Sequence, residues 1–352
     1  MRHRPFIIPV FIPHMGCPHR CVFCDQTSIT GHRDGGISPQ QVREQVSEFL
    51  SLERKNRGPV EVAFYGGNFL GLPTAYRTSL LDVAQGFVED GTVSGIRFST
   101  RPDTIYDETL HSLSPYAVLV VEVGAQSMDD TVLAQSRRGH TADDTRKAVK
   151  ALKARGLSTG VQMMPGLPGD TFVSMLGTGM RVADMNPDFV RIYPTVVVKN
   201  TILEKWYKSG VFKPLALTEA VEVTKTLFLL FQARGIPVIR MGLQTTSSLQ
   251  EPGAVVAGPF HPAFGHLVHS AVFLDRAVRA LEEKRPESKR IVLSVHPRDV
   301  PKIKGLKGEN IRQLVERFEL EELQVFPDPL LSQNALRVAS LGEGASIKMH
   351  SA

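Results

Sequence analysis

The chain has 352 residues, of which 42% are hydrophobic and 22% are charged. This composition excludes a disordered or fibrous protein, and the length exceeds the roughly 100 to 200 residues of one typical domain. The net charge of +5 permits a polyanionic partner without requiring one. Apolar runs such as 117–123 fall far short of the ~20 residues that cross a bilayer, and the basic start is followed by a strand-like run. We therefore expect a cytoplasmic protein that does not enter a membrane.

Apolar, β-branched runs alternate with longer segments of helical period over the first 240 residues. The predicted strands are 6–11, 60–65, 95–100, 117–123, 158–163, 189–193 and 237–240. The predicted helices begin at cap or proline signals and cover 38 onward, 73–89, 141–155, 170–185 and 218–234. This alternation predicts an α/β fold of six or seven parallel β-α units, a sheet or barrel whose active site is expected after the carboxyl ends of the strands.

Composition changes after about residue 241, where helical periodicity weakens and Gly, Pro, Ser and Thr become frequent. We therefore predict three parts: a barrel over 1–245, a covering loop and helix over 246–285, and a small α+β region over 286–352.

The three cysteines of the chain, Cys17, Cys21 and Cys24, lie together directly after the first predicted strand. Three thiolates at this C-x3-C-x2-C spacing can hold three irons of a 4Fe-4S cluster and leave the fourth iron open. The alternative is a zinc site completed by His14 or His19. The place of the loop, at the carboxyl end of a barrel strand, favours the cluster.

Other segments follow successive strand ends in the same order. They are Phe64-Tyr65-Gly66-Gly67-Asn68-Phe69, Ser99-Thr100-Arg101-Pro102-Asp103, Val121 to Ser127, Arg137-Arg138-Gly139-His140-Thr141, Met163 to Gly169 and Arg191 to Val196. With the cysteine loop, they resemble the radical S-adenosylmethionine (SAM) enzymes. The closer resemblance is to the branch that contains the catalytic subunit of Elongator, and oxygen-independent coproporphyrinogen oxidase is a more distant relative. The resemblance implies a partial (β/α)6-type radical SAM barrel.

The resemblance also implies roles for particular residues. The cysteines would hold the 4Fe-4S cluster, and the backbone at Gly66-Gly67-Asn68 would receive the amino group of SAM, since glycine permits a close approach. Gln126 would bind the ribose or adenosine side, and Arg138 would pair with the methionine carboxylate through its planar fork. The remaining expected cofactor contacts are Phe23, Ser99 and Gln162.

The sequence departs from the family pattern at three places. Ser99 stands where the family usually has Glu, and Gln162 stands where relatives carry His or Asp. Nothing after residue 245 resembles the acetyltransferase domain of the Elongator subunit. An acetyl-CoA-dependent reaction is therefore not implied.

The C-terminal region begins with a predicted strand at 291–295 and a short helix at 299–303. Lys304-Gly305-Leu306-Lys307-Gly308 follows, then a helical segment and a strand at 323–326. This β-α-GxxG-α-β order resembles a KH domain, in which about four nucleotides lie against the loop. A plain helix-linking turn is the alternative for the GxxG segment.

The resemblance implies reductive cleavage of SAM at the cluster to a 5'-deoxyadenosyl radical, which abstracts hydrogen from a substrate. Tyr193, Lys199 and Asn200 follow the sixth strand, where a substrate pocket is expected. With the KH-like region, RNA, and tRNA in particular, is the first substrate hypothesis, and a ferredoxin or flavodoxin is the expected electron donor. The alternatives are a small-molecule or peptide substrate and an RNA-binding iron-sulfur redox sensor.

Overall fold

The computed structural model describes residues 5–12, 15–25, 36–52, 58–244 and 247–341. It divides the chain into two compact units, Met1–Pro262 and Ala263–Ala352. The predicted covering segment is split by this boundary, because its loop lies in the first unit and its helix in the second. No helix of the described residues is long and apolar enough to span a bilayer.

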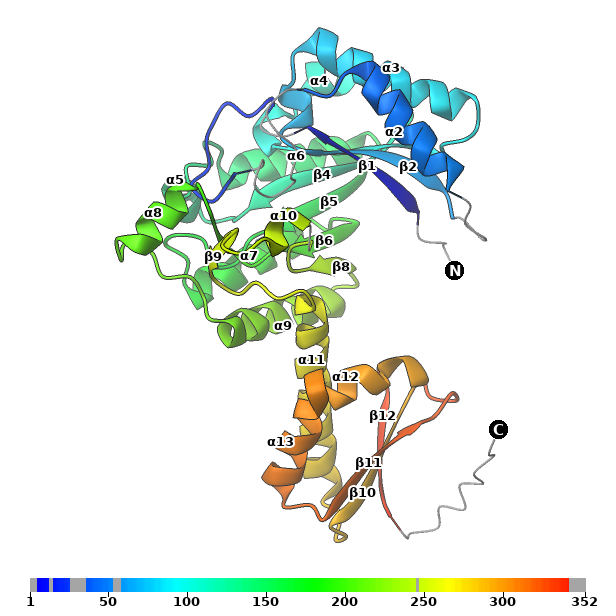
Figure 1. Cartoon of the computed structure of the whole chain (residues 1–352), viewed down its shortest axis with the longest axis vertical. Coiled ribbons are helices and arrows are strands. Elements are labelled where there is room, and N and C mark those ends of the chain that lie inside the picture. The colour runs from blue at the N-terminus through cyan, green and yellow to red at the C-terminus, as the bar shows by residue number, and fades with distance from the viewer. Residues whose placement is uncertain (1–4, 13–14, 26–35, 53–57, 245–246, 342–352) are drawn as a thin grey trace. The chain divides into compact units, whose positions relative to one another are not determined.

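The first unit is built on one sheet of seven parallel strands that curls into a partial barrel (Figure 1). The strands are adjacent in chain order, with β8 paired to β6 at the far edge. Their bounds are β1 (Phe6–Ile12), β2 (Val60–Gly66), β3 (Gly95–Thr100), β4 (Val118–Gln126), β5 (Ser158–Met163), β6 (Phe189–Ile192) and β8 (Val238–Met241). The predicted α/β class and partial barrel are confirmed, and each predicted strand is present to within a few residues.

Helices follow the strands of the sheet, and the longer ones pack on one face of it (Figure 1). The helices of this unit that contribute to this packed face are α2 (Pro39–Ser51), α3 (Thr74–Glu89), α4 (Asp107–His111), α6 (Ala142–Ala154), α7 (Phe172–Asp184) and α9 (Leu217–Ala233). The short helices α5 (Asp130–Gln135), α8 (Ile202–Lys208) and α10 (Ser247–Gln250) belong instead to smaller clusters or loops. The starts of α2 and α6 carry the signals that predicted them: Ser38 forms a capping box with Gln41, and Thr141 forms one with Asp144. The short α4, α5, α8 and α10, and the small sheet of β7 (Val197–Val198) and β9 (Val255–Ala257), were not predicted.

The helix-facing side of the sheet forms the main hydrophobic core. Its strand residues are β-branched, aliphatic or aromatic, and most of them are fully buried. Phe69, in the turn after β2, stacks between Phe64 and Phe98 with ring centroids 4.8 and 4.7 Å away. This aromatic stack fixes the loop after β2 against β2 and β3, at the carboxyl ends of these strands.

The second unit packs one long helix and two short ones on a three-stranded sheet (Figure 1). Its elements are α11 (Phe264–Lys284), β10 (Arg290–Val295), α12 (Val300–Lys304), α13 (Glu309–Phe318), β11 (Glu322–Pro327) and β12 (Leu336–Ser340). The sheet order is β11-β10-β12, with β11 parallel and β12 antiparallel to β10. The predicted strand-helix-GxxG-helix-strand order is present, and β12 was not predicted. The KH resemblance stays a prediction.

We expect the aromatic stack of Phe64, Phe69 and Phe98 to contribute several kcal/mol to the free energy of unfolding of the first unit, roughly the value lost when a buried Phe is replaced by Ala. Phe98→Ala should lower the free energy of unfolding by about 3–5 kcal/mol, because Phe98 is fully buried and its removal leaves a cavity. Phe172→Ala is the control, because Phe172 is 53% exposed, and it should change stability by no more than about 0.5 kcal/mol. Urea unfolding followed by fluorescence of Trp206, the single tryptophan, reports on this unit. Equal effects of both substitutions would contradict the expectation.

Candidate active site

The cysteine loop leaves the carboxyl end of β1 and packs against the loops around α5 and α8. The Val22 amide donates to the Ser136 carbonyl (3.2 Å), and the Val22 carbonyl accepts from the Leu203 amide (2.8 Å). Val22 is fully buried, and Phe23 lies largely buried in the same small hydrophobic cluster. The loop is thus held by its apolar residues, between the cysteines, at the end of the barrel where an active site was predicted.

Asn68, after β2, connects the cysteine loop to the loop after β3. Its side-chain Nδ2 donates to the Gly16 carbonyl (2.7 Å), and its backbone amide donates to the Met15 carbonyl (3.1 Å). Its Oδ1 accepts from the Thr100 hydroxyl (2.6 Å) and the Arg101 amide (3.0 Å). The side chain is completely buried, so these bonds replace all its contacts with water. Asn68 was predicted as a cofactor contact, and in the structure its side chain bonds to the cysteine loop and to the loop after β3.

The two-glycine segment is packed just as closely against the cysteine loop. A Cβ on Gly67 would lie 2.3 Å from the Met15 carbonyl oxygen, and one on Gly16 would lie 2.2 Å from the Asn68 carbonyl oxygen. Gly16 also has φ of +73°, which L side chains rarely adopt. These glycines therefore permit a contact between the two loops, whatever further role the Gly66-Gly67 backbone has toward a ligand.

Arg138 reaches from the segment after α5 to the cysteines. Its Nη1 lies 3.2 Å from Cys21 Sγ, and its Nη2 donates to the Gly124 carbonyl (2.7 Å). Arg101 donates to the Arg138 carbonyl and forms two hydrogen bonds with Asp103, at 2.9 and 2.8 Å. Two guanidinium nitrogens here, Arg101 Nη1 and Arg138 Nε, are buried without a hydrogen-bond partner in the described structure. The site therefore has two guanidinium N–H groups near the cysteine thiols that form no hydrogen bond in the described structure.

Burial and the neighbouring Cys21 raise the pKa of the Cys17 thiol, although Arg101 and Arg138 act in the opposite direction. Metal binding must therefore displace a proton from this thiol. No set of three His, Cys, Asp or Glu side chains in the described part of the chain is gathered around one point. His14, an alternative zinc ligand, lies outside the described residues, and His19 lies against Gly139.

The donor chemistry nonetheless suits an iron-sulfur cluster. Three thiols on one loop are the ligand type that such clusters use, and the buried guanidinium groups of Arg101 and Arg138 would offset their negative charge. Cys17, Cys21 and Cys24 are therefore the residues that would hold it.

His140 and two glutamines surround the end of β4. The Nε2 of His140 lies 3.2 Å from the Ala125 carbonyl, which can only accept, so Nε2 carries the proton. Burial, followed by the charges of Arg138 and Arg101, lowers the pKa of His140 to about 3, so the ring is neutral at pH 7. Gln162 on β5 donates to Gln126 Oε1 (3.2 Å), and Gln126 has φ of +65°. The fold thus brings together two predicted cofactor contacts from neighbouring strands.

Charged and polar residues line the face of the sheet opposite the helices. Glu122 on β4 is the centre: its carboxylate lies 3.3 Å from Arg97 Nη1 on β3 and 2.7 Å from Arg191 Nε on β6. Arg97 Nε also contacts Glu61 on β2 at 2.5 Å. Tyr65 donates to Glu122 (3.0 Å), and Arg191 donates to Tyr193 (3.0 Å) and Tyr65 (3.4 Å). We call this set, together with Arg240 on β8, the inner ionic face.

Apart from Tyr193, the members of this face were not among the site residues predicted from the sequence. A signal was available, because single charges interrupt otherwise apolar strands at Glu61, Arg97, Glu122 and Arg191. Ser99, which replaces the family's usual Glu, pairs in register with Glu122. Burial, then the charge of Glu122, raises the pKa of Tyr65 to about 12, so its hydroxyl stays protonated.

The three predicted pocket residues are placed differently from one another. Tyr193 belongs to the inner ionic face. Lys199 and Asn200 are exposed beyond β7, where their amides bond to the Ala254 carbonyl and to Glu204 (2.9 and 2.8 Å). In the described structure no hydrogen bond joins either of them to Tyr193.

The predicted RNA-binding loop of the second unit links α12 to α13. Gly305, Lys307 and Gly308 have φ of +73°, +52° and +77°. A Cβ on Gly305 would lie 2.9 Å from Asn310, which is buried and donates to the Ser270 and Lys302 carbonyls (2.9 and 3.2 Å). Asn310 thereby holds the loop in a fixed form, while the side chains of Lys304, Leu306 and Lys307 are exposed.

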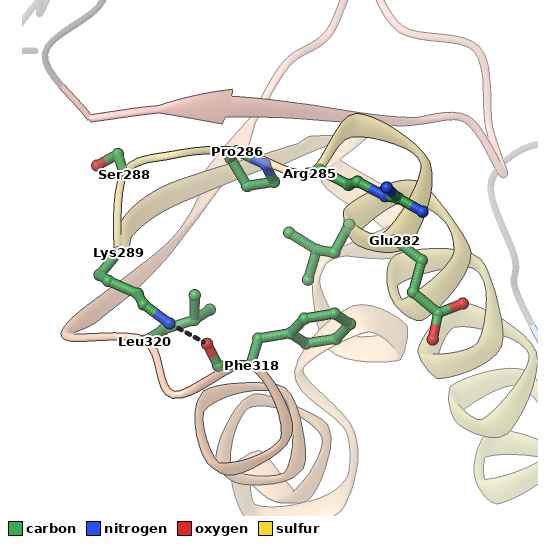
Figure 2. Close-up of a pocket in the computed structure, with 8 residues that line it drawn as sticks. Glu282, Arg285, Pro286, Ser288, Lys289, Phe318 and Leu320 are labelled. Carbon is green, nitrogen blue, oxygen red and sulfur yellow. Dashed lines mark hydrogen bonds between the residues drawn. The ribbon is translucent and has the colours of Figure 1, made fainter.

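The second unit also contains a hollow of about 500 Å³ between the end of α11 and the end of α13. Figure 2 shows Phe318 and Leu320 in this hollow, with Arg285 and Lys289 at its edge. Lys289 donates to the Phe318 carbonyl (3.2 Å) and lies 3.8 Å from Glu319. Lys289, at the edge of this hollow, is therefore already paired within the second unit.

Comparison with known proteins identifies relatives that are similar in sequence to more than half of this chain. The chain is 35% identical over 255 residues to a tRNA uridine(34) acetyltransferase of Methanocaldococcus jannaschii, covering 62% of this chain and 47% of that protein. It is 25% identical over 263 residues to human Elongator complex protein 3, covering 62% and 48%. The chain thus spans about half the length of these curated relatives.

The fold agrees with solved structures. An archaeal Methanocaldococcus infernus Elp3 superposes with a TM-score of 0.59 at 22% identity, covering 78% of this chain and 63% of that one. Methylornithine synthase superposes with a TM-score of 0.50 at 15% identity, covering 71% and 77%. The radical SAM superfamily model matches residues 11–178, which include the cysteine loop and Arg138, and the radical SAM C-terminal domain model matches residues 187–273. The chain therefore belongs to the radical SAM superfamily of enzymes.

Proposed function

We propose that this protein cleaves SAM reductively at a 4Fe-4S cluster held by Cys17, Cys21 and Cys24, and that it modifies RNA, with tRNA as the first candidate. The observation that carries the proposal is the cysteine loop at the carboxyl end of β1, beside the buried guanidinium of Arg138. When bound, the cluster supplies the electron that converts SAM to a hydrogen-abstracting radical.

The chain's own residues would position the cofactor and exclude water from it. The Asn68 hydrogen bonds keep the cysteine loop against the loops of β2 and β3. Arg138, held by the Gly124 carbonyl, has a buried Nε that is free to bind the carboxylate of SAM. Gln126 and Gln162 would bind its nucleoside by hydrogen bonds.

Two observations support RNA as the substrate. The relatives include enzymes named for tRNA uridine 34, although the chain spans about half of their length. The second unit holds a rigid GxxG loop with exposed lysines in the element order of a KH domain. The acetyl transfer in the relatives' names is not part of the proposal, because nothing in residues 246–352 of this sequence resembles an acetyltransferase domain.

The cluster assignment is tested by metal content. After anaerobic reconstitution, the wild-type protein should bind about four irons with matching sulfide, and Cys24→Ser should lose most of them and all 5'-deoxyadenosine formation. His19→Ala is the control and should keep both, because His19 is an exposed residue outside the ligand set. Zinc in place of iron, with loss on His19→Ala, would support the zinc alternative and contradict the proposal.

Arg138→Gln tests the carboxylate contact. A hydrogen bond to a charged group contributes about 1.5–3 kcal/mol, so we expect SAM affinity to fall about 10- to 100-fold while iron content is retained. The matched control is Arg137→Gln, because Arg137 is exposed beside the Trp206 ring, 6.0 Å from its centroid. Equal SAM affinity in the two variants would show that Arg138 does not bind the carboxylate. Loss of iron from Arg138→Gln would show instead that Arg138 acts on the cluster loop, through its contact with Cys21.

The proposal that the GxxG loop binds RNA is tested by a double substitution in the full chain, Leu306→Asp with Lys307→Asp. We expect tRNA binding at low salt to weaken at least tenfold and its salt dependence to become shallower, because phosphate contacts are lost. Ser288→Asp with Lys289→Asp makes the same change in charge beside the hollow of Figure 2 and should have a much smaller effect. Absence of tRNA binding by the wild-type protein would favour a small-molecule or peptide substrate.

A further inference from the structure

The inner ionic face contains more positive than negative charge. Its strands carry three arginines, Arg97, Arg191 and Arg240, and two glutamates, Glu61 and Glu122. Glu61, Arg97, Glu122 and Arg191 are joined by ion pairs on one side of the sheet. Arg240 is placed on the same side by its pairing with Arg191, which follows a register shift that leaves Ile239 without a partner on β6. The described strand residues of this face therefore leave one guanidinium without a carboxylate.

Both glutamates are already used by the other two arginines. Glu61 pairs with Arg97 at 2.5 Å, and Glu122 is shared between Arg97 and Arg191. The side chains of both glutamates are less than 10% exposed, so neither can turn toward another cation without breaking a buried pair. Both carboxylates of this face are therefore already paired with Arg97 or Arg191.

Arg240 is the arginine that remains. It pairs in register with Arg191 across β6 and β8, so its nearest charged strand neighbour has the same sign. Within the described residues it forms no hydrogen bond or ion pair, and its Nε is buried without an acceptor. Tyr65 cannot supply a negative charge, since the pKa of its hydroxyl is raised to about 12. A half-buried guanidinium in this state destabilises the fold unless an anion joins it.

We propose that Arg240, with Arg191 beside it, binds an oxyanion of the substrate on the inner face of the barrel. Gln162 pairs in register with Arg191 and bonds to Gln126, which places this anion site next to the expected cofactor contacts. A guanidinium binds carboxylate and phosphate with the same planar fork, so the anion is a nucleotide phosphate or an organic carboxylate. This inference rests on the proposed function only in taking the inner face as the substrate side.

The test is calorimetric titration of the reconstituted protein with paired probes. Uridine 5'-monophosphate is compared with uridine, and malonate with malonamide, so the pair that binds identifies the source of the anion. We expect one anion to bind and its neutral counterpart to bind at least tenfold more weakly. Arg240→Gln should weaken that anion at least tenfold, and Arg240→Lys should restore part of the loss. Arg234→Gln, at an exposed arginine paired with Asp184 at 3.1 Å, should bind as the wild type does.

Thermal unfolding without ligand separates a binding role from a structural one. Removing an unpaired, half-buried charge should leave the Tm of Arg240→Gln equal to or above that of the wild type. A Tm lower by several degrees, binding of neither anion, or displacement of the anion by SAM would overturn the inference. Formation of 5'-deoxyadenosine by the wild-type protein is measured separately, so failure of the radical chemistry is distinguishable from failure of the anion site.

Discussion

The buried side chain of Asn68 holds together the loops that make up the candidate site. A single buried amide joins the cysteine loop after β1 to the loop after β3, and its own backbone belongs to the loop after β2. The three loops can meet only because Gly16 and Gly67 have no Cβ at the contact. Since a buried amide without partners is costly, this arrangement is cooperative: each loop is positioned by the other two.

The two faces of the sheet differ in polarity: one is apolar and the other carries buried ion pairs. The apolar face stabilises the fold, and the ionic face is therefore available for a site. The helix-facing side is apolar and supplies stability through burial. The other side holds buried ion pairs around Glu122, which are a weak source of stability because the charges lose their hydration. Such a face instead holds charges at defined positions, as the substrate side of the proposed reaction would require.

The second unit has its own hydrophobic core, formed by α11 and the three-stranded sheet. Its GxxG loop is held by Asn310, much as the cysteine loop is held by Asn68: a buried side-chain amide bonds to backbone carbonyls where a glycine permits a close approach. In both units an asparagine thus sets the conformation of a loop, and the exposed or reactive side chains of that loop are left available.

The α/β class, the seven strands, the position of the cysteine loop and the family resemblance could all be predicted from the amino-acid sequence. These are local properties: periodicity, cap residues such as Ser38 and the spacing of three cysteines can be read along the chain. The folded chain was needed to show that the side chain of Asn68 joins two loops, that Lys199 and Asn200 form no hydrogen bond with Tyr193 in the described structure, and that Glu122 is shared by two arginines. The last of these facts depends on side-chain contacts between residues 25 and 69 positions apart in the sequence, Arg97 with Glu122 and Glu122 with Arg191. A charge within an apolar strand shows that something must compensate it, but which partner does so is settled only when the sheet forms.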